Sequence, residues 1–142
     1  MIVGVIDGQG GGIGAQIVAR LKGKLPEGWE LLALGTNAAA TAAMLKAGAE
    51  RGGSGEGAVV WNSLRCAALA GPVGIVLANA MLGELTPRMA EAVASSPARK
   101  FLVPLSVCGV EVAGVGRATL PELIADLVER LAAWAQDPEA QD

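Results

Sequence analysis

The sequence of 142 residues contains no histidine and no tyrosine. Without histidine, the chain cannot form a Ser-His or Cys-His nucleophilic pair, a histidine metal site or an imidazole acid–base catalyst. Its two cysteines, Cys66 and Cys108, lack the short spacing of a metal or redox motif and cannot build a zinc site alone. We therefore expect no metal centre, and the sequence does not indicate a reaction.

Charged residues are sparse, at 18% of the chain, and the formal net charge is −3. This balance offers no basic surface for nucleic acid or for anionic lipid. Residues 66–83 contain no charge, but two glycines, a proline and an asparagine interrupt them, so two elements joined by a loop explain this run better than a membrane span. The N-terminus also lacks the basic and apolar regions of a signal peptide. We expect a cytoplasmic protein that binds neither nucleic acid nor a membrane.

Apolar residues are abundant, at 52%, and they open the chain. Residues 2–6 form the short apolar run of a strand that is buried on both faces. Five glycines within residues 8–14 then allow a tight turn and the close approach of a ligand. Ile13, Ile17 and Leu21 recur at helical spacing, so the free N–H groups of a helix should point into this turn. Such an arrangement is an anion site, and phosphate is its usual occupant.

Strands and helices are predicted to alternate along the rest of the chain. We predict further strands at 30–34, 58–61, 73–78 and 100–105, a candidate sixth strand at 110–113, and helices at 12–24, 38–47, 64–70, 87–95 and 120–134. Glycine-rich residues 51–57 lack a Walker ending and are predicted to be a flexible connection.

This order predicts one Rossmann-like α/β domain over residues 1–135, a three-layer α-β-α sandwich with a mostly parallel sheet of five or six strands. Residues 136–142 are predicted to be a polar tail that frays. The alanine-rich helix 38–47 can lie flat on the sheet or against a second subunit, which leaves a homodimer open.

Ligands of such sheets bind beyond the carboxyl ends of the strands, near the switch point in strand order. Small polar residues are predicted at these ends, including Ser63, Ser106 and Cys108, although any strand must end in something polar. The predicted ligand-binding residues are Asp7, Gly8, Gln9, Gly10, Gly11, Gly12, Ile13, Gly14, Gly35, Thr36, Asn37, Asn62 and Asn79.

The glycine turn satisfies the dinucleotide fingerprint as Gly10-x-Gly12-x-x-Ala15. A dinucleotide site usually has Asp or Glu about 20 residues further on, to hold the ribose hydroxyls. Here that position falls in residues 34–37, which contain neither an acid nor an arginine for a 2′-phosphate. Thr36 or Asn37 can bond a ribose instead, and the sequence does not distinguish NAD from NADP.

Part of the chain resembles the short-chain dehydrogenases. Gly8-x-x-x-Gly12-Ile13-Gly14 is similar to their glycine motif, with Asp7 in place of the usual threonine. Residues 78–80 resemble their Asn-Ala-Gly turn, and Ser106 follows a strand where their serine lies. The Tyr-x-x-x-Lys pair that performs their chemistry is absent, so the resemblance covers the nucleotide-binding half and implies no dehydrogenase activity.

Four segments together resemble a small bacterial family over nearly the whole chain: residues 6–14, 33–37, 42–49 and 80–87. The family is a domain of unknown function with a Rossmann-like core. The resemblance implies that fold and favours the glycine turn as the site, and it brings no activity with it.

Three functional hypotheses remain. The first is a protein that binds a nucleotide or dinucleotide, NAD(P) among them, through a phosphate on the glycine turn. Asp7 would then either orient the ligand or only form hydrogen bonds within the turn. Asn79 would either approach the ligand or only close its own turn. The second is a non-catalytic sensor or interaction module whose glycine turn is structural. The third is a cobalamin domain, suggested by Asp7-x-Gln9-x-x-Gly12 and opposed by the missing histidine.

If the protein is an enzyme, few side chains near strand ends or helix starts can carry a proton. The candidates are Asp7, Lys46, Glu84 and Cys108, with Lys46 more simply a solvated lysine and Cys108 a buried apolar residue.

Overall fold

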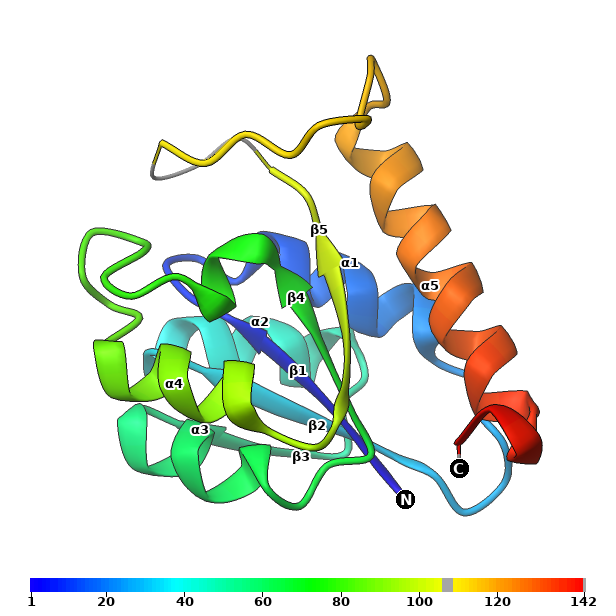
Figure 1. Cartoon of the computed structure of the whole chain (residues 1–142). Helices are drawn as coiled ribbons and strands as arrows, with labels where there is room; N and C mark the ends of the chain where they lie inside the picture. The colour runs from blue at the N-terminus through cyan, green and yellow to red at the C-terminus, as the bar shows by residue number, and fades with distance from the viewer. Residues whose placement is uncertain (106–108, 142) are drawn as a thin grey trace.

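In the part of the chain that the structure describes, five parallel strands form one sheet in the order β3-β2-β1-β4-β5 (Figure 1). The structure, a computed structural model, describes residues 1–105 and 109–141. The strands are β1 (Ile2–Asp7), β2 (Glu30–Gly35), β3 (Arg51–Ser54), β4 (Ala68–Pro72) and β5 (Arg99–Val103). The helices are α1 (Gly12–Leu21), α2 (Ala38–Ala47), α3 (Glu56–Ser63), α4 (Pro87–Ser95) and α5 (Leu120–Gln136), with the short 3₁₀ helices η1 (Val73–Val76) and η2 (Pro138–Gln141). The predicted α/β class and parallel sheet are confirmed.

The helices cover both faces of the sheet, as the three-layer prediction requires. Val3 and Val5 of β1 point to the face covered by α1, α2 and α5, whereas Ile6 points to the face covered by α3 and α4. Alternate residues of a strand point to opposite faces, so a central strand covered on both sides is apolar throughout. The two layers are visible on either side of the sheet in Figure 1.

Three helix starts follow the capping patterns of the sequence. The side chain of Asn37 accepts a hydrogen bond from the amide of Ala40 at 2.8 Å and begins α2. Thr86 precedes Pro87 and begins α4 in the same way, and Thr119 forms a capping box with Glu122 at the start of α5. Each cap satisfies amide groups that have no partner within the helix.

The middle of the chain differs from the prediction. Residues 51–54 form edge strand β3 rather than a flexible connection, and a Cβ on Gly52 would lie only 2.7 Å from the methyl group of Thr41 on α2. The predicted strand 58–61 lies within α3, the predicted helix 64–70 overlaps β4, and the predicted strand 73–78 begins as η1. Tertiary packing overrides local propensity here, because valine-rich α3 buries one side while alanine-rich β4 is buried throughout.

The last third of the chain needs two smaller corrections. Within residues 109–113, only Val110 has a strand-like bridge, so the candidate sixth strand does not form among the described residues. The predicted polar tail contains a short helix, since α5 extends to Gln136 and η2 folds back so that the indole of Trp134 donates to the carbonyl of Ala140 at 3.1 Å. No helix among the described residues is long and apolar enough to cross a membrane.

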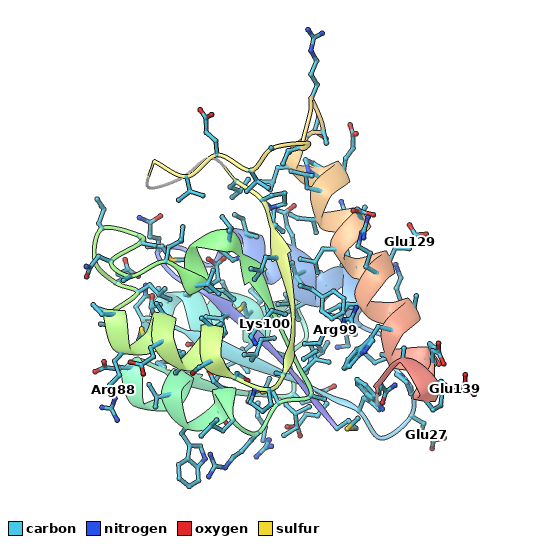
Figure 2. All side chains as sticks on the ribbon, in the orientation of Figure 1. Glu27, Arg88, Arg99, Lys100, Glu129 and Glu139 are labelled. Carbon is cyan, nitrogen blue, oxygen red and sulfur yellow. The ribbon has the colours of Figure 1, made fainter. Side chains whose placement is uncertain are left out.

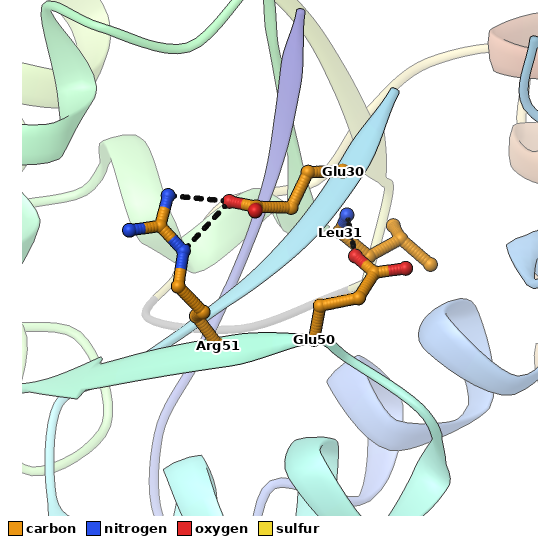
Figure 3. Close-up of polar contacts among 4 residues, drawn as sticks. All are labelled: Glu30, Leu31, Glu50 and Arg51. Atoms are coloured by element: carbon orange, nitrogen blue, oxygen red, sulfur yellow. Dashed lines mark hydrogen bonds and ion pairs between the residues drawn. The ribbon is translucent and has the colours of Figure 1, made fainter. Parts of the chain in front are cut away.

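Polar side chains join β2 and β3 where these strands begin (Figure 3). The guanidinium group of Arg51 donates twice to one carboxylate oxygen of Glu30, at 2.6 and 3.0 Å. The carboxylate of Glu50 accepts from the amide of Leu31. These contacts lie at the amino ends of the strands, which is the edge of the sheet opposite to the expected ligand crevice.

Candidate functional site

The candidate site lies where the strand order changes direction, beyond the carboxyl ends of β1 and β4. After β1 the chain moves through β2 to β3, and it then returns through α3 to β4 on the other side of β1. A cavity of about 380 Å³ opens at this point. It is lined by Asp7, Gln9, Ile13, Pro72, Gly74, Ala80, Met81, Leu82 and Leu105. Such switch points are the usual ligand crevices of doubly wound sheets.

Asp7 closes the glycine turn from inside. One carboxylate oxygen accepts the amide of Gly8 at 2.8 Å, and the other accepts the amide of Gly14 at 2.7 Å. The side chain is 5% exposed, and this burial raises the pKa of Asp7, although the amide hydrogen bonds partly oppose the shift. The turn-bonding role expected for Asp7 is therefore present, and its carboxyl group also reaches the cavity wall.

Three of the five loop glycines are required by the fold itself. Gly11 has a φ of 71°, a left-handed conformation that side chains disfavour, and a Cβ there would lie 2.8 Å from the backbone of Ala40. A Cβ on Gly8 would lie 2.6 Å from the hydroxyl of Thr36, and one on Gly14 would lie 2.8 Å from the Cβ of Asp7. At these three positions the absent Cβ lets the turn and the start of α1 lie close to Thr36, α2 and Asp7.

Gly10 and Gly12 are different. Both are exposed, neither has a positive φ, and a Cβ at either position would meet no atom within 4 Å. Their amide N–H groups bond no other residue in the described part of the chain. Since folding does not explain these two glycines, they leave an open approach to unpaired amides at the start of α1.

Glu84 supplies the acid that the sequence lacks after β2. A single oxygen of its carboxylate, Oε1, accepts from the amide of Gln9 at 2.8 Å, the hydroxyl of Thr36 at 2.7 Å and the side-chain amide of Asn37 at 2.8 Å. The hydroxyl of Thr36 contributes most to lowering the pKa of Glu84 below its ordinary value. The second oxygen, Oε2, bonds no described residue.

The role of Glu84 could not be found from sequence spacing. The sequence indicates Glu84 only as a candidate proton carrier. Its contact with Thr36 joins two residues that are 48 positions apart in the chain. The connection between η1 and α4 (green in Figure 1) carries it across the sheet to the end of β2. A long-range contact of this kind has no signal in one sequence.

This connection has an unusual backbone. Asn79, Met81 and Leu82 have φ values of 67°, 60° and 57°, which place three non-glycine residues in the left-handed region. Met81 packs against Gly8, whereas the side chain of Leu82 is 98% exposed at the mouth of the cavity. Backbone of this kind is disfavoured by roughly 1–3 kcal/mol per residue and occurs most often at functional sites.

Most of the predicted site residues come together. The glycine turn and residues 35–37 meet through Glu84, and Asn79 lies nearby in the connection, where its backbone amide donates to the carbonyl of Leu85 at 2.7 Å. Lys46 is exposed in the last turn of α2, away from this edge of the sheet. Ser106 and Cys108 lie outside the described residues.

Asn62 was assigned to the site because a strand was predicted to end just before it, and that strand prediction was wrong. Asn62 does not end a strand but lies near the end of α3, where its side chain donates to the carbonyl of Ala58 at 2.8 Å. The chain continues from it to Ala67, whose amide donates to the carbonyl of Ile2 at the beginning of β1. Asn62 therefore lies at the opposite edge of the sheet from the cavity, and so does Ser63.

Comparison with known proteins identifies one relationship. A family model described as a domain of unknown function (DUF3842) matches residues 2–136. No curated protein and no solved structure matches the chain.

Proposed function

The chain belongs to the DUF3842 family, and from its geometry we propose that it binds a nucleotide, most suitably a dinucleotide, across the carboxyl ends of β2, β1 and β4. The observation that carries this proposal is the pair Gly10 and Gly12, which the fold does not require. The absent Cβ atoms let a phosphate oxygen approach the unpaired amides of the turn, and the dipole of α1 favours its negative charge.

The acid at the end of β2 supports a ribose on that side. The free Oε2 atom of Glu84 can accept hydrogen bonds from ribose hydroxyls, while its partners Thr36 and Asn37 keep the carboxylate in place. No lysine or arginine bonds to these three residues among those described. A 2′-phosphate would therefore meet a carboxylate without a compensating cation, so the site should prefer NAD to NADP.

The cavity on the β4 side supports a second, flatter group. Its volume of about 380 Å³ and its walls of Ile13, Met81, Leu82 and Leu105 suit an aromatic ring. Asp7 and Gln9 are the polar residues that line it, and the carboxylate of Asp7 can accept a hydrogen bond from a ligand amide or hydroxyl.

Titration calorimetry with NAD, NADP, ATP and inorganic phosphate tests the proposal. We expect NAD to bind and NADP to bind at least about tenfold more weakly, a difference of roughly 1.4 kcal/mol. Gly10→Ala and Gly12→Ala should leave the fold intact, because each new methyl group enters open space, and should weaken NAD binding by about tenfold or more.

Gly57→Ala is the matched control. Gly57 is also exposed, has no positive φ and meets no atom within 4 Å, but it lies on α3 and away from the turn. Equal NAD affinity in all three variants and the unchanged protein, or no binding of any nucleotide in the set, would show that the turn is only structural.

A second function, a ligand sensor without catalysis, is favoured by one observation. Glu84 ties the strained connection to the glycine turn through Gln9, so a ligand there would share contacts with a segment held in an unfavourable conformation. An enzyme would convert the bound cofactor, whereas a sensor would change only shape or assembly.

A further inference from the structure

Strand β5 leaves one edge of the sheet open. Among the residues that the structure describes it pairs only with β4, and the amide of Arg99 donates to the carbonyl of Ala67 on that side. Backbone groups alternate in direction along a parallel strand, so the amide and carbonyl groups of Lys100 and Leu102 point outward. This edge can therefore form main-chain hydrogen bonds with another extended segment.

Helix α5 forms a wall beside this open edge (Figure 1). Between α5 and β5 lies a groove of about 570 Å³. Phe101 contributes its floor, and Leu123, Leu127 and Trp134 contribute apolar surface from the helix. A strand placed against β5 would thus cover apolar side chains on one of its faces as well as the free backbone groups.

The charges of the groove indicate what kind of strand fits. In the described part of the chain, three cations line it, Arg99, Lys100 and Arg130, against one acid, Asp126, which is already paired with Arg130 at 2.9 Å. Among the described residues, neither Arg99 nor Lys100 forms an ion pair. Figure 2 shows both side chains at β5. This local excess of positive charge contrasts with the net charge of −3 of the whole chain.

A second copy of the chain fits this edge poorly. Pairing β5 with β5 of another copy would bring two further unpaired cations, Arg99 and Lys100, into the same groove and add no acid to it. The ammonium group of Lys100 also donates to the carbonyl of Ser96. It is therefore held in place and does not serve only as a mobile charge that prevents edge-to-edge association. Charge complementarity instead favours an acidic occupant.

We propose that the open edge of β5 binds an extended acidic segment of another protein as a sixth strand. Its main chain bonds Lys100 and Leu102, its apolar side chains pack on α5, and its carboxylates, on the opposite face of the added strand, lie near Lys100. This inference is independent of nucleotide binding, because the groove lies at the edge of the sheet and shares none of the residues that line the cavity beside the glycine turn.

Two-dimensional NMR of the whole chain with a probe peptide tests it. The probe is a short blocked peptide of alternating valine and glutamate, and the matched probe replaces each glutamate with lysine. We expect the first peptide to shift and protect from exchange the amides of Lys100 and Leu102, and to bind about tenfold more tightly than the second. Lys100→Glu should abolish this difference, whereas Arg88→Glu, at an exposed position of α4, should preserve it.

Three results would overturn the proposal. The first is the absence of binding by the acidic peptide, and the second is equal binding of both peptides. The third is protection of Lys100 and Leu102 without peptide in a species of twice the chain mass, which would assign the edge to a second copy. Circular dichroism of both variants distinguishes loss of binding from loss of folding.

Discussion

Asp7 is a residue whose ionisation is disfavoured by folding. In the unfolded chain its carboxyl group ionises near pH 3.9, whereas burial raises its pKa in the native protein. Between these two values the native state binds more protons than the unfolded state. The free energy of unfolding contributed by Asp7 must therefore fall as pH rises through that window, and then stay constant above it.

Urea unfolding from about pH 4 to 7 measures this effect when the protein is compared with Asp7→Asn. Asparagine has a similar shape but no titration, so its constant difference in stability is irrelevant and only the change with pH matters. We expect the stability of the unchanged protein relative to Asp7→Asn to decrease as pH rises. An increase would mean that the amides of Gly8 and Gly14 outweigh burial and lower the pKa instead.

Residue identity alone predicted the glycine turn but not which of its glycines the packing requires. All five glycines satisfy the same pattern, and only the contacts around them separate Gly8, Gly11 and Gly14, which the packing requires, from Gly10 and Gly12, which it does not. The acid at β2 was likewise missed, because no local rule connects Glu84 with Thr36.

In the connection between η1 and α4, a substitution that raises the free energy of unfolding should also weaken ligand binding. Leu82 adopts a φ of 57° while its side chain is 98% exposed, so the strain is not balanced by burial. Leu82→Gly should raise the free energy of unfolding by up to about 1 kcal/mol, because glycine adopts this conformation without steric cost. The same variant should weaken binding of any ligand that packs on Leu82 in the cavity.

Urea unfolding and calorimetry of the same sample test both parts. Met81→Gly is the control, since Met81 has a similar φ of 60° but packs against the core and should lose stability overall. If Leu82→Gly also destabilises the chain, the positive φ is not a source of strain at this position.

At the same scale, the elements with clear ends were predicted and those defined by packing were not. Proline, glycine and capping threonine fixed α2, α4 and α5 to within about two residues. In contrast, β3 is an Arg-Gly-Gly-Ser strand whose two glycines make room for α2 on one face and α3 on the other. Strand β4 is built of small residues because helices cover both of its faces. Their strand character comes from neighbours distant in sequence.

At the scale of the whole molecule, topology fixes where the candidate site lies, in spite of these errors. Alternating strands and helices with right-handed connections place every strand parallel, so all the carboxyl ends meet at one edge of the sheet. The position of the site therefore depended on the alternation, which was predicted correctly, rather than on the bounds of β3 and β4. Asn62 and Ser63, assigned through a strand that is really α3, lie at the opposite edge, and so does the candidate proton carrier Lys46 in the last turn of α2.

The same topology predicts how a ligand should stabilise the molecule. The glycine turn continues directly from β1, which pairs with β2 and β4 and carries core residues on both faces. NAD at about 100 times its Kd should then add roughly 2.7 kcal/mol to global unfolding and raise the melting temperature by roughly 8 °C.

Two probes distinguish global from local stabilisation. Trp29 and Trp134 stack edge to face, with ring centres 5.9 Å apart, where β2 begins and α5 ends, at the far edge of the sheet from the turn. We expect their fluorescence and the far-ultraviolet dichroism to shift to the same higher midpoint with NAD. In a two-state domain all probes report the same transition, so stabilisation of β1 should appear in every element packed on it. A shift in dichroism alone would instead mean that the turn and its helix unfold separately from the rest.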